Sequence, residues 1–183
     1  EEHYNMQDVL VVAMYLNTFV RNAHIVKMAN MAQLVNVIAP MMVTDDKLWM
    51  QTIYYPLQLF ATNCFGNAIQ PYVECDKYDA GDYKQIPYLD VSTVYNPKRK
   101  EVLINVVNRH DSKAIDTSIQ NQVGKWASKA LVYEINSPNL ADENSVSEQK
   151  VKTKEKEIAI SGNSIAYSFP AHSFTMIKIK VTE

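Results

Sequence analysis

Carboxylate side chains are the first groups to weigh, because hydrolysis by paired carboxylates requires two of them to face one bond. Asp45 and Asp46 are adjacent and precede a helical pattern, where Asp is favoured, so we interpret them as a solvated turn. Asp76, Asp79 and Asp82 lie in tyrosine-rich sequence and are interpreted as a loop. Their spacing lacks the later carboxylate of a calcium-binding loop. The sequence therefore offers no pair of carboxylates that spacing alone brings together.

The sequence also gives little support for a metal site or a catalytic nucleophile. The sequence has no glycine-rich phosphate loop, no Gly-x-Ser-x-Gly elbow and no His-Glu-x-x-His motif. Its histidines are far apart and have no ligand spacing: His3, His24, His110 and His172. Cys64 and Cys75 make neither a disulfide scaffold nor a zinc site, and we interpret Cys64 as a buried free thiol. No metal ion and no cofactor is therefore predicted.

One pair of side-chain amides stands out. Gln33 and Asn36 follow a short apolar stretch, Ile25–Ala29, which we interpret as a buried parallel strand. In a barrel of parallel strands, residues at the carboxyl ends of the strands face the active site. Amides at that position can hydrogen-bond sugar hydroxyls. The alternative is that Gln33 satisfies backbone groups of its own loop, and the sequence alone does not separate the two.

The elements around these amides follow a helix, strand, helix order. Asn5 is a good N-cap, and the apolar residues after it recur at helical spacing, which predicts a helix over Met6–Arg21. The strand Ile25–Ala29 and a second helix over Leu48–Asn63 follow. This order is typical of a parallel sheet, which one strand cannot form. We therefore expect a piece of a longer protein, whose other strands lie outside a sequence that starts at Glu1 without an initiator Met.

The second part of the chain, from Ile69 onward, alternates short β patterns with turns. The predicted strands are Leu89–Tyr95, Glu101–Asn108, Ile115–Gln120, Ser128–Ile135, Glu157–Ile160, Ser164–Phe169 and Phe174–Val181. The polar residues 136–156 are expected to form a long loop with one short strand, Val146–Val151. This pattern predicts an antiparallel β-sandwich of the jelly-roll kind.

Charge and hydropathy exclude two classes of partner. The net charge of −2 at pH 7 gives no basic field for nucleic acid and no polybasic arm for a membrane surface. No apolar run reaches the length of a membrane span. The expected partners therefore include neither nucleic acid nor membrane.

Four stretches of the sequence resemble family 51 α-L-arabinofuranosidases. The stretch His24–Pro40, which contains AQLVNVIAP, looks like the last barrel strand of that family and the loop after it. Trp49–Pro56 is similar to the family's Trp-Arg-Gln-Thr-Ile-Phe-Tyr-Pro, and Tyr4–Val12 resembles its penultimate helix. Pro170–Ile179 resembles the closing strand of the β-sandwich found behind such barrels. The resemblance runs in order along nearly the whole chain.

The resemblance implies an α+β fragment with two parts. Residues 1–68 would be the end of a catalytic (β/α)8 TIM barrel, with its penultimate helix, last strand and last helix, and residues 69–183 would be the C-terminal sandwich. The parent would be a retaining enzyme that removes arabinofuranosyl groups from carbohydrate, with two catalytic glutamates about 5 Å apart. Both glutamates are expected upstream, so the resemblance implies no catalytic residue here and no activity for the isolated chain.

The same resemblance implies roles for three side chains. Gln33 matches the glutamine that hydrogen-bonds the arabinofuranose next to the scissile bond. Asn36 matches a family position without an assigned sugar contact, and Trp49 would line the pocket mouth or pack its own helix. Some family members are oligomers, so a homo-oligomeric parent is expected. The natural polysaccharide, its linkage and the compartment, whether bacterial cytoplasm, periplasm or exterior, stay open.

Departures from the family pattern surround these side chains. The acidic residue expected around Ala23–Ile25 is missing, the turn Asp45–Leu48 lacks its glycine, and Met50 replaces a basic residue. These changes bear on the substrate loop and hence on linkage preference, whereas Gln33 is intact.

Two other functions fit the sandwich pattern. A carbohydrate-binding module would present aromatic rings on one face, for which Trp126, Tyr133 and Tyr167 are candidates. The other function is that of a purely structural interaction domain. Such a scaffold would have no reason to keep Gln33 at the end of a barrel strand.

Overall fold

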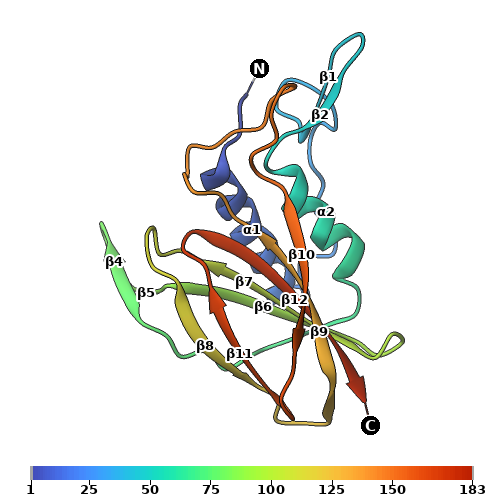
Figure 1. The fold of residues 1–183 in the computed structure, drawn as a ribbon, viewed down its shortest axis with the longest axis vertical. Helices are drawn as coiled ribbons and strands as arrows, with labels where there is room; N and C mark the ends of the chain where they lie inside the picture. Colours follow the sequence, from blue (N-terminus) through green and yellow to red (C-terminus); the bar gives the residue numbers. More distant parts are fainter. Residues whose placement is uncertain (1, 183) are drawn as a thin grey trace.

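Residues 2–182, which the computed structural model describes, form two helices and twelve strands (Figure 1). The bounds are α1 Met6–Arg21, β1 Met41–Val43, β2 Leu48–Met50, α2 Tyr54–Asn63, β3 Asn67–Ile69, β4 Lys77–Ala80, β5 Tyr83–Pro87, β6 Leu89–Asn96, β7 Glu101–Asn108, β8 Ile115–Gln120, β9 Lys125–Ile135, β10 Thr153–Ala159, β11 Ser164–Phe169 and β12 Ser173–Thr182. No helix among these residues is long and apolar enough to cross a membrane.

Helix α1 begins where the sequence predicts. The Asn5 side chain accepts hydrogen bonds from the backbone N–H groups of Gln7 and Asp8, and the Asp8 carboxylate accepts the Asn5 N–H at 2.9 Å. This capping box satisfies donors that the first turn leaves free. Met6, Val9 and Ala13 on its inner face are fully buried.

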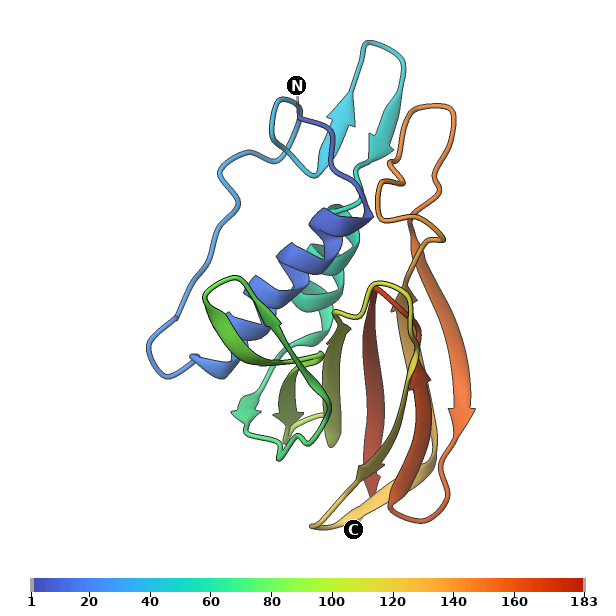
Figure 2. The same ribbon diagram turned by 90° about the vertical axis from the view of Figure 1, so that its left-hand side faces the viewer.

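The main sheet has six antiparallel strands in the order β10-β9-β12-β7-β6-β3, and β8 pairs with β11 in a second layer. One face of the main sheet packs on α1 and α2, which lie side by side in Figure 2. The other face packs on β8 and β11. Strands β7 and β12 lie inside the main sheet and are buried on both faces over most of their length. The predicted antiparallel sandwich is confirmed.

Each strand predicted between Leu89 and Val181 is present except one, with bounds shifted by a few residues. The exception is Val146–Val151, which is wrong. Its residues lie in a loop with isolated bridges only, from Asn144 to Gln149 and from Glu143 to Asn5. The Asn144 side chain donates to the carbonyl of Val151 at 2.7 Å and accepts the Val151 N–H at 2.9 Å. Because this side chain satisfies the backbone, no partner strand is needed.

The predicted barrel strand Ile25–Ala29 is also wrong, because these residues form no strand. Ile25 is 69% exposed and Met28 is 78% exposed. A parallel strand needs hydrogen-bonded neighbours on both sides, and no strand among residues 2–182 lies beside this segment. It runs instead as an extended connection away from the body of the molecule (Figure 2).

The second predicted helix, Leu48–Asn63, is correct only in its later part. Helix α2 begins at Tyr54, and Leu48–Met50 is strand β2, paired with β1 in a hairpin. The turn between the strands is closed by the Thr44 N–H, which donates to the Lys47 carbonyl at 2.9 Å. Strands β4 and β5 form another hairpin, over residues that we predicted as loop. The predicted division between residues 68 and 69 falls inside β3.

Candidate functional site

Gln33 lies in the irregular segment that leads from α1 to the β1–β2 hairpin, and its side chain is exposed. Three residues later the chain makes a tight loop. The backbone of Asn36 has φ of 61°, and its side-chain oxygen accepts the Val43 N–H at 2.7 Å. The Asn36 N–H donates to the Met41 carbonyl at 2.8 Å. The loop therefore folds back onto β1 directly after Gln33.

Trp49 lies in the middle of β2, opposite Met42 of β1. Met42 is 2% exposed, whereas Trp49 is only half-buried. The segment after α1 and the β1–β2 hairpin therefore form one structural unit, which contains Gln33, Asn36 and Trp49.

Gln51 anchors this unit to the rest of the molecule. Its side chain is 2% exposed and its amide is fully used. The amide nitrogen donates to the Glu2 carbonyl at 3.1 Å and to the Ala39 carbonyl at 2.9 Å, while the amide oxygen accepts the Tyr4 N–H at 3.1 Å. One side chain therefore ties the N-terminal segment, the loop after Gln33 and the approach to α2 together. Sequence reasoning missed Gln51, although it lies two residues after Trp49 in the matched stretch.

A second polar cluster, also missed, lies between α1 and the main sheet. The Asp90 carboxylate is 7% exposed and accepts both terminal nitrogens of Arg21, each at 3.1 Å. It also accepts Arg109 at 2.6 Å and the buried amide of Asn17 at 2.7 Å. The Asn17 oxygen accepts the Ser92 hydroxyl at 2.6 Å. The strand residues of this cluster are far from the helix residues in the sequence, so no local sequence pattern predicts that they meet.

Cys64 confirms the prediction of a free thiol, although some of its surface stays accessible. Burial raises the pKa of its thiol to about 12, against a small lowering by the hydrogen bond from Asn105. A thiol with such a high pKa is not a nucleophile near neutral pH.

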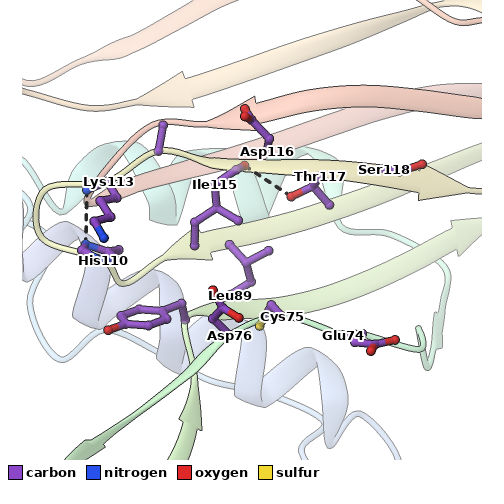
Figure 3. A pocket seen from close by; sticks show the side chains of 12 residues that line it. Glu74, Cys75, Asp76, Leu89, His110, Lys113, Ile115, Asp116, Thr117 and Ser118 are labelled. Atoms are coloured by element: carbon purple, nitrogen blue, oxygen red, sulfur yellow. Dashed lines mark hydrogen bonds between the residues drawn. The ribbon is translucent and has the colours of Figure 1, made fainter.

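A hollow of about 660 Å³ opens between β8 and the segment before β4 (Figure 3). Asp76, Tyr88, His110, Lys113 and Asp116 are among its lining residues, and Gln33, Asn36 and Trp49 are not. His110 stacks on Tyr88 at 4.7 Å between ring centroids, and its Nδ1 accepts the backbone N–H of Lys113 at 3.2 Å. The imidazole is thus engaged by its own loop rather than aimed at a ligand.

Metal binding has no support from side-chain placement. Among residues 2–182, no three histidine, cysteine, aspartate or glutamate side chains gather closely enough to hold a metal ion. The chemistry that the Gln33 loop can supply is hydrogen bonding to a polar ligand.

Comparison with protein families gives a match over residues 1–173, to the family described as alpha-L-arabinofuranosidase C-terminal domain. A probable alpha-L-arabinofuranosidase C from Aspergillus terreus is 35% identical over 187 aligned residues, which cover 98% of this chain and 36% of that protein. An intracellular exo-alpha-(1->5)-L-arabinofuranosidase from Halalkalibacterium halodurans is 38% identical over 117 residues, covering 63% of this chain and 23% of that protein. The chain thus spans about a third or less of these relatives.

Solved structures agree on the fold. The alpha-L-arabinofuranosidase of Thermotoga maritima, solved as an arabinose complex, superposes with a TM-score of 0.87 at 23% identity, over 99% of this chain and 39% of that one. A family 51 alpha-L-arabinofuranosidase from Bifidobacterium longum gives the same TM-score and identity, over 98% of this chain and 36% of that one. Both helices and the sandwich are therefore shared with these enzymes.

Proposed function

Because this chain belongs to the alpha-L-arabinofuranosidase C-terminal domain family, we propose that it is the C-terminal part of a retaining α-L-arabinofuranosidase. The longer enzyme removes terminal arabinofuranosyl groups from oligosaccharides or polysaccharides. The single observation that carries the proposal is the family match over residues 1–173, which includes both helices and strands β1 to β11. Both catalytic glutamates lie upstream of this chain in the proposed enzyme, so the chain alone is inactive.

In this proposal residues 1–68 complete the catalytic barrel and residues 69–183 buttress it. The exposed apolar residues of the segment after α1 support this division: Ile25, Met28, Leu34, Val35, Val37 and Ile38. A soluble protein rarely leaves so many apolar side chains uncovered in one segment. The rest of the barrel would cover these side chains.

Gln33 is the residue we propose to contact the sugar. Its exposed amide can donate to one hydroxyl and accept from another. Trp49, on the same structural unit and only half-buried, is the proposed wall of the pocket mouth. An arabinofuranosyl carbohydrate is therefore the proposed ligand of this edge of the molecule.

The alternative of a carbohydrate-binding module is weakened by where its aromatic residues lie. Trp126 and Tyr167 are each 8% exposed, so neither ring offers a platform for a sugar. The ring of Tyr133 lies beneath the Lys178 ammonium, 5.7 Å from its centroid. The three rings thus belong to the sandwich core and its edge contacts.

The test is release of arabinose from an aryl α-L-arabinofuranoside by the full-length protein that contains this chain, compared with the chain alone. We expect activity only in the former. Gln33→Ala in the full-length protein should lower kcat/KM about tenfold or more, since one or two hydrogen bonds to the sugar are lost. Gln58→Ala, which removes an exposed amide from α2, is the matched control and should leave kcat/KM unchanged. An inactive full-length protein would refute the proposed reaction.

A further inference from the structure

The loop between Gln33 and Trp49 has an unusual backbone. Asn36 and Val37 have φ of 61° and 58°, in the left-handed region. Asn tolerates this conformation because its short polar side chain can bond locally, but a β-branched residue such as Val does so at a cost. The conformation at Val37 must therefore be imposed by contacts around it.

The contacts that impose it converge on Asn36. The backbone of Asn36 donates to the Met41 carbonyl at 2.8 Å and accepts the Ala39 N–H at 3.0 Å. Its side-chain oxygen accepts the Val43 N–H at 2.7 Å. One residue therefore closes the inner turn and fastens it to the far end of β1.

The closed loop is fixed on both sides. On one side, the amide of the buried Gln51 holds the Ala39 carbonyl at 2.9 Å, and the Gln51 N–H holds the Pro40 carbonyl at 2.9 Å. On the other side, Val43 pairs with Leu48, next to Trp49. The Asn36 bond to Val43 thus sets how the segment carrying Gln33 meets the strand carrying Trp49.

We propose that Asn36 is a positioning residue of the arabinofuranosyl site, which fixes the exposed Gln33 amide relative to Trp49. This inference rests on the proposed function. The side-chain oxygen of Asn36 accepts the Val43 N–H, so this oxygen holds the loop closed against β1. A misplacement of about 1 Å at a binding group can cost up to about a hundredfold in rate, so a loop clamp of this kind has a measurable effect.

The test uses two substitutions at Asn36 in the full-length enzyme. Asn36→Gly keeps the left-handed backbone accessible but removes the acceptor for the Val43 N–H. Asn36→Asp keeps an oxygen that can accept the same bond. Gln85→Gly is the matched control, because Gln85 also has positive φ, 55°, but lies on β5 in another hairpin. Arabinose inhibition and KM are the readouts, since neither depends on the fraction of enzyme that is folded.

We expect Asn36→Gly to raise KM and the inhibition constant of arabinose about tenfold. In Asn36→Asp both constants should stay close to their wild-type values, and Gln85→Gly should change neither. In a Gln33→Ala background, Asn36→Gly should have little further effect, because Asn36 acts through Gln33. Unchanged KM and inhibition constant in Asn36→Gly, or a full additional loss in the Gln33→Ala background, would overturn the inference. An inactive wild-type enzyme would instead overturn the proposed function.

Discussion

Removing the Asp90 carboxylate should destabilise the protein more than removing any exposed carboxylate. Asp90 is 7% exposed and forms ion pairs with two guanidinium groups, those of Arg21 and Arg109. Asp90→Ala removes the carboxylate that binds the Arg109 guanidinium, whose side chain is only 18% exposed. It also removes one acceptor of the fully buried Asn17 amide. Breaking a buried ion pair by removing one partner costs about 3–5 kcal/mol.

The lower end of that range applies here. The Arg21 side chain is 37% exposed, so water can solvate its charge once Asp90 is gone. We therefore expect a loss of about 3 kcal/mol in the free energy of unfolding. With a urea dependence of about 2 kcal/mol per molar, the midpoint of urea unfolding should fall by roughly 1.5 M.

The matched control is Asp79→Ala. Asp79 pairs with Lys84 at 3.5 Å across the β4–β5 hairpin, and both side chains are about half exposed or more, at 49% and 64%. Such surface pairs contribute less than about 1 kcal/mol, so the midpoint should move little. Equal shifts for Asp79→Ala and Asp90→Ala would refute the reasoning from burial.

Three further predictions concern single side chains. In a Cys75→Ser variant, Cys64 should react with a thiol reagent at pH 8 only as the protein unfolds, because burial raises the pKa of its thiol to about 12; fast reaction in the absence of denaturant would contradict this. The hydrogen bond from the Ser137 hydroxyl lowers the pKa of Asp142 in the folded protein. The ionised carboxylate therefore stabilises the fold at pH values above the unfolded pKa of about 3.9. This stabilisation is lost as the pH falls through the lower pKa of the folded state. Asp142→Asn should therefore lower Tm at neutral pH and flatten the fall of Tm below about pH 4, and an unchanged acid limb would count against it. Phe174→Ala, which empties a site with 0% exposure, should cost about 3–5 kcal/mol in urea unfolding, and a loss under about 1 kcal/mol would show that the core refills the cavity.

Local signals explain which elements could be predicted. The capping box of Asn5 and Asp8 lies within four residues of sequence, so the start of α1 is predicted to the residue. The period-two alternation of Leu89–Tyr95 similarly locates β6. Short hairpins carry weaker signals. In β1–β2 and β4–β5 each strand has three to five residues, too few for a period to be read.

The strand predicted at Ile25–Ala29 failed for a different reason. Its mostly apolar sequence is typical of a strand covered on both faces, but no strand among residues 2–182 pairs with it. The burial pattern of a strand is set by its neighbours, so an isolated apolar run cannot decide its own conformation.

The candidate site was accessible to sequence only in part. Gln33 and Trp49 were identified through the stretches that resemble the family. The chemistry of an amide side chain alone did not decide whether Gln33 binds a sugar or its own loop backbone. The cluster at Asp90 includes bonded residues up to 75 positions apart, such as Asn17 and Ser92. A polar residue in a strand carries no sequence signal that identifies its partner in a helix. Gln51 was missed because nothing in its local sequence indicates the three backbone groups, from distant residues, that its side-chain amide binds.

The polar residues 136–156 were predicted as a long loop; residues 136–152 are that loop, before β10 begins at Thr153, and they contact both α1 and the β1–β2 hairpin. Met6 at the start of α1 donates its N–H to the Asp142 carbonyl at 2.9 Å. The Asn144 amide, 4% exposed, donates to the Met50 carbonyl at 3.1 Å, at the end of the strand that carries Trp49. A buried amide that binds backbone on both sides leaves unsatisfied carbonyls when it is removed, so this contact resists sliding of the hairpin over the sandwich. The loop of residues 136–152 therefore supports the β1–β2 hairpin directly, through the bond from Asn144 to Met50, in addition to the apolar layer beneath α1.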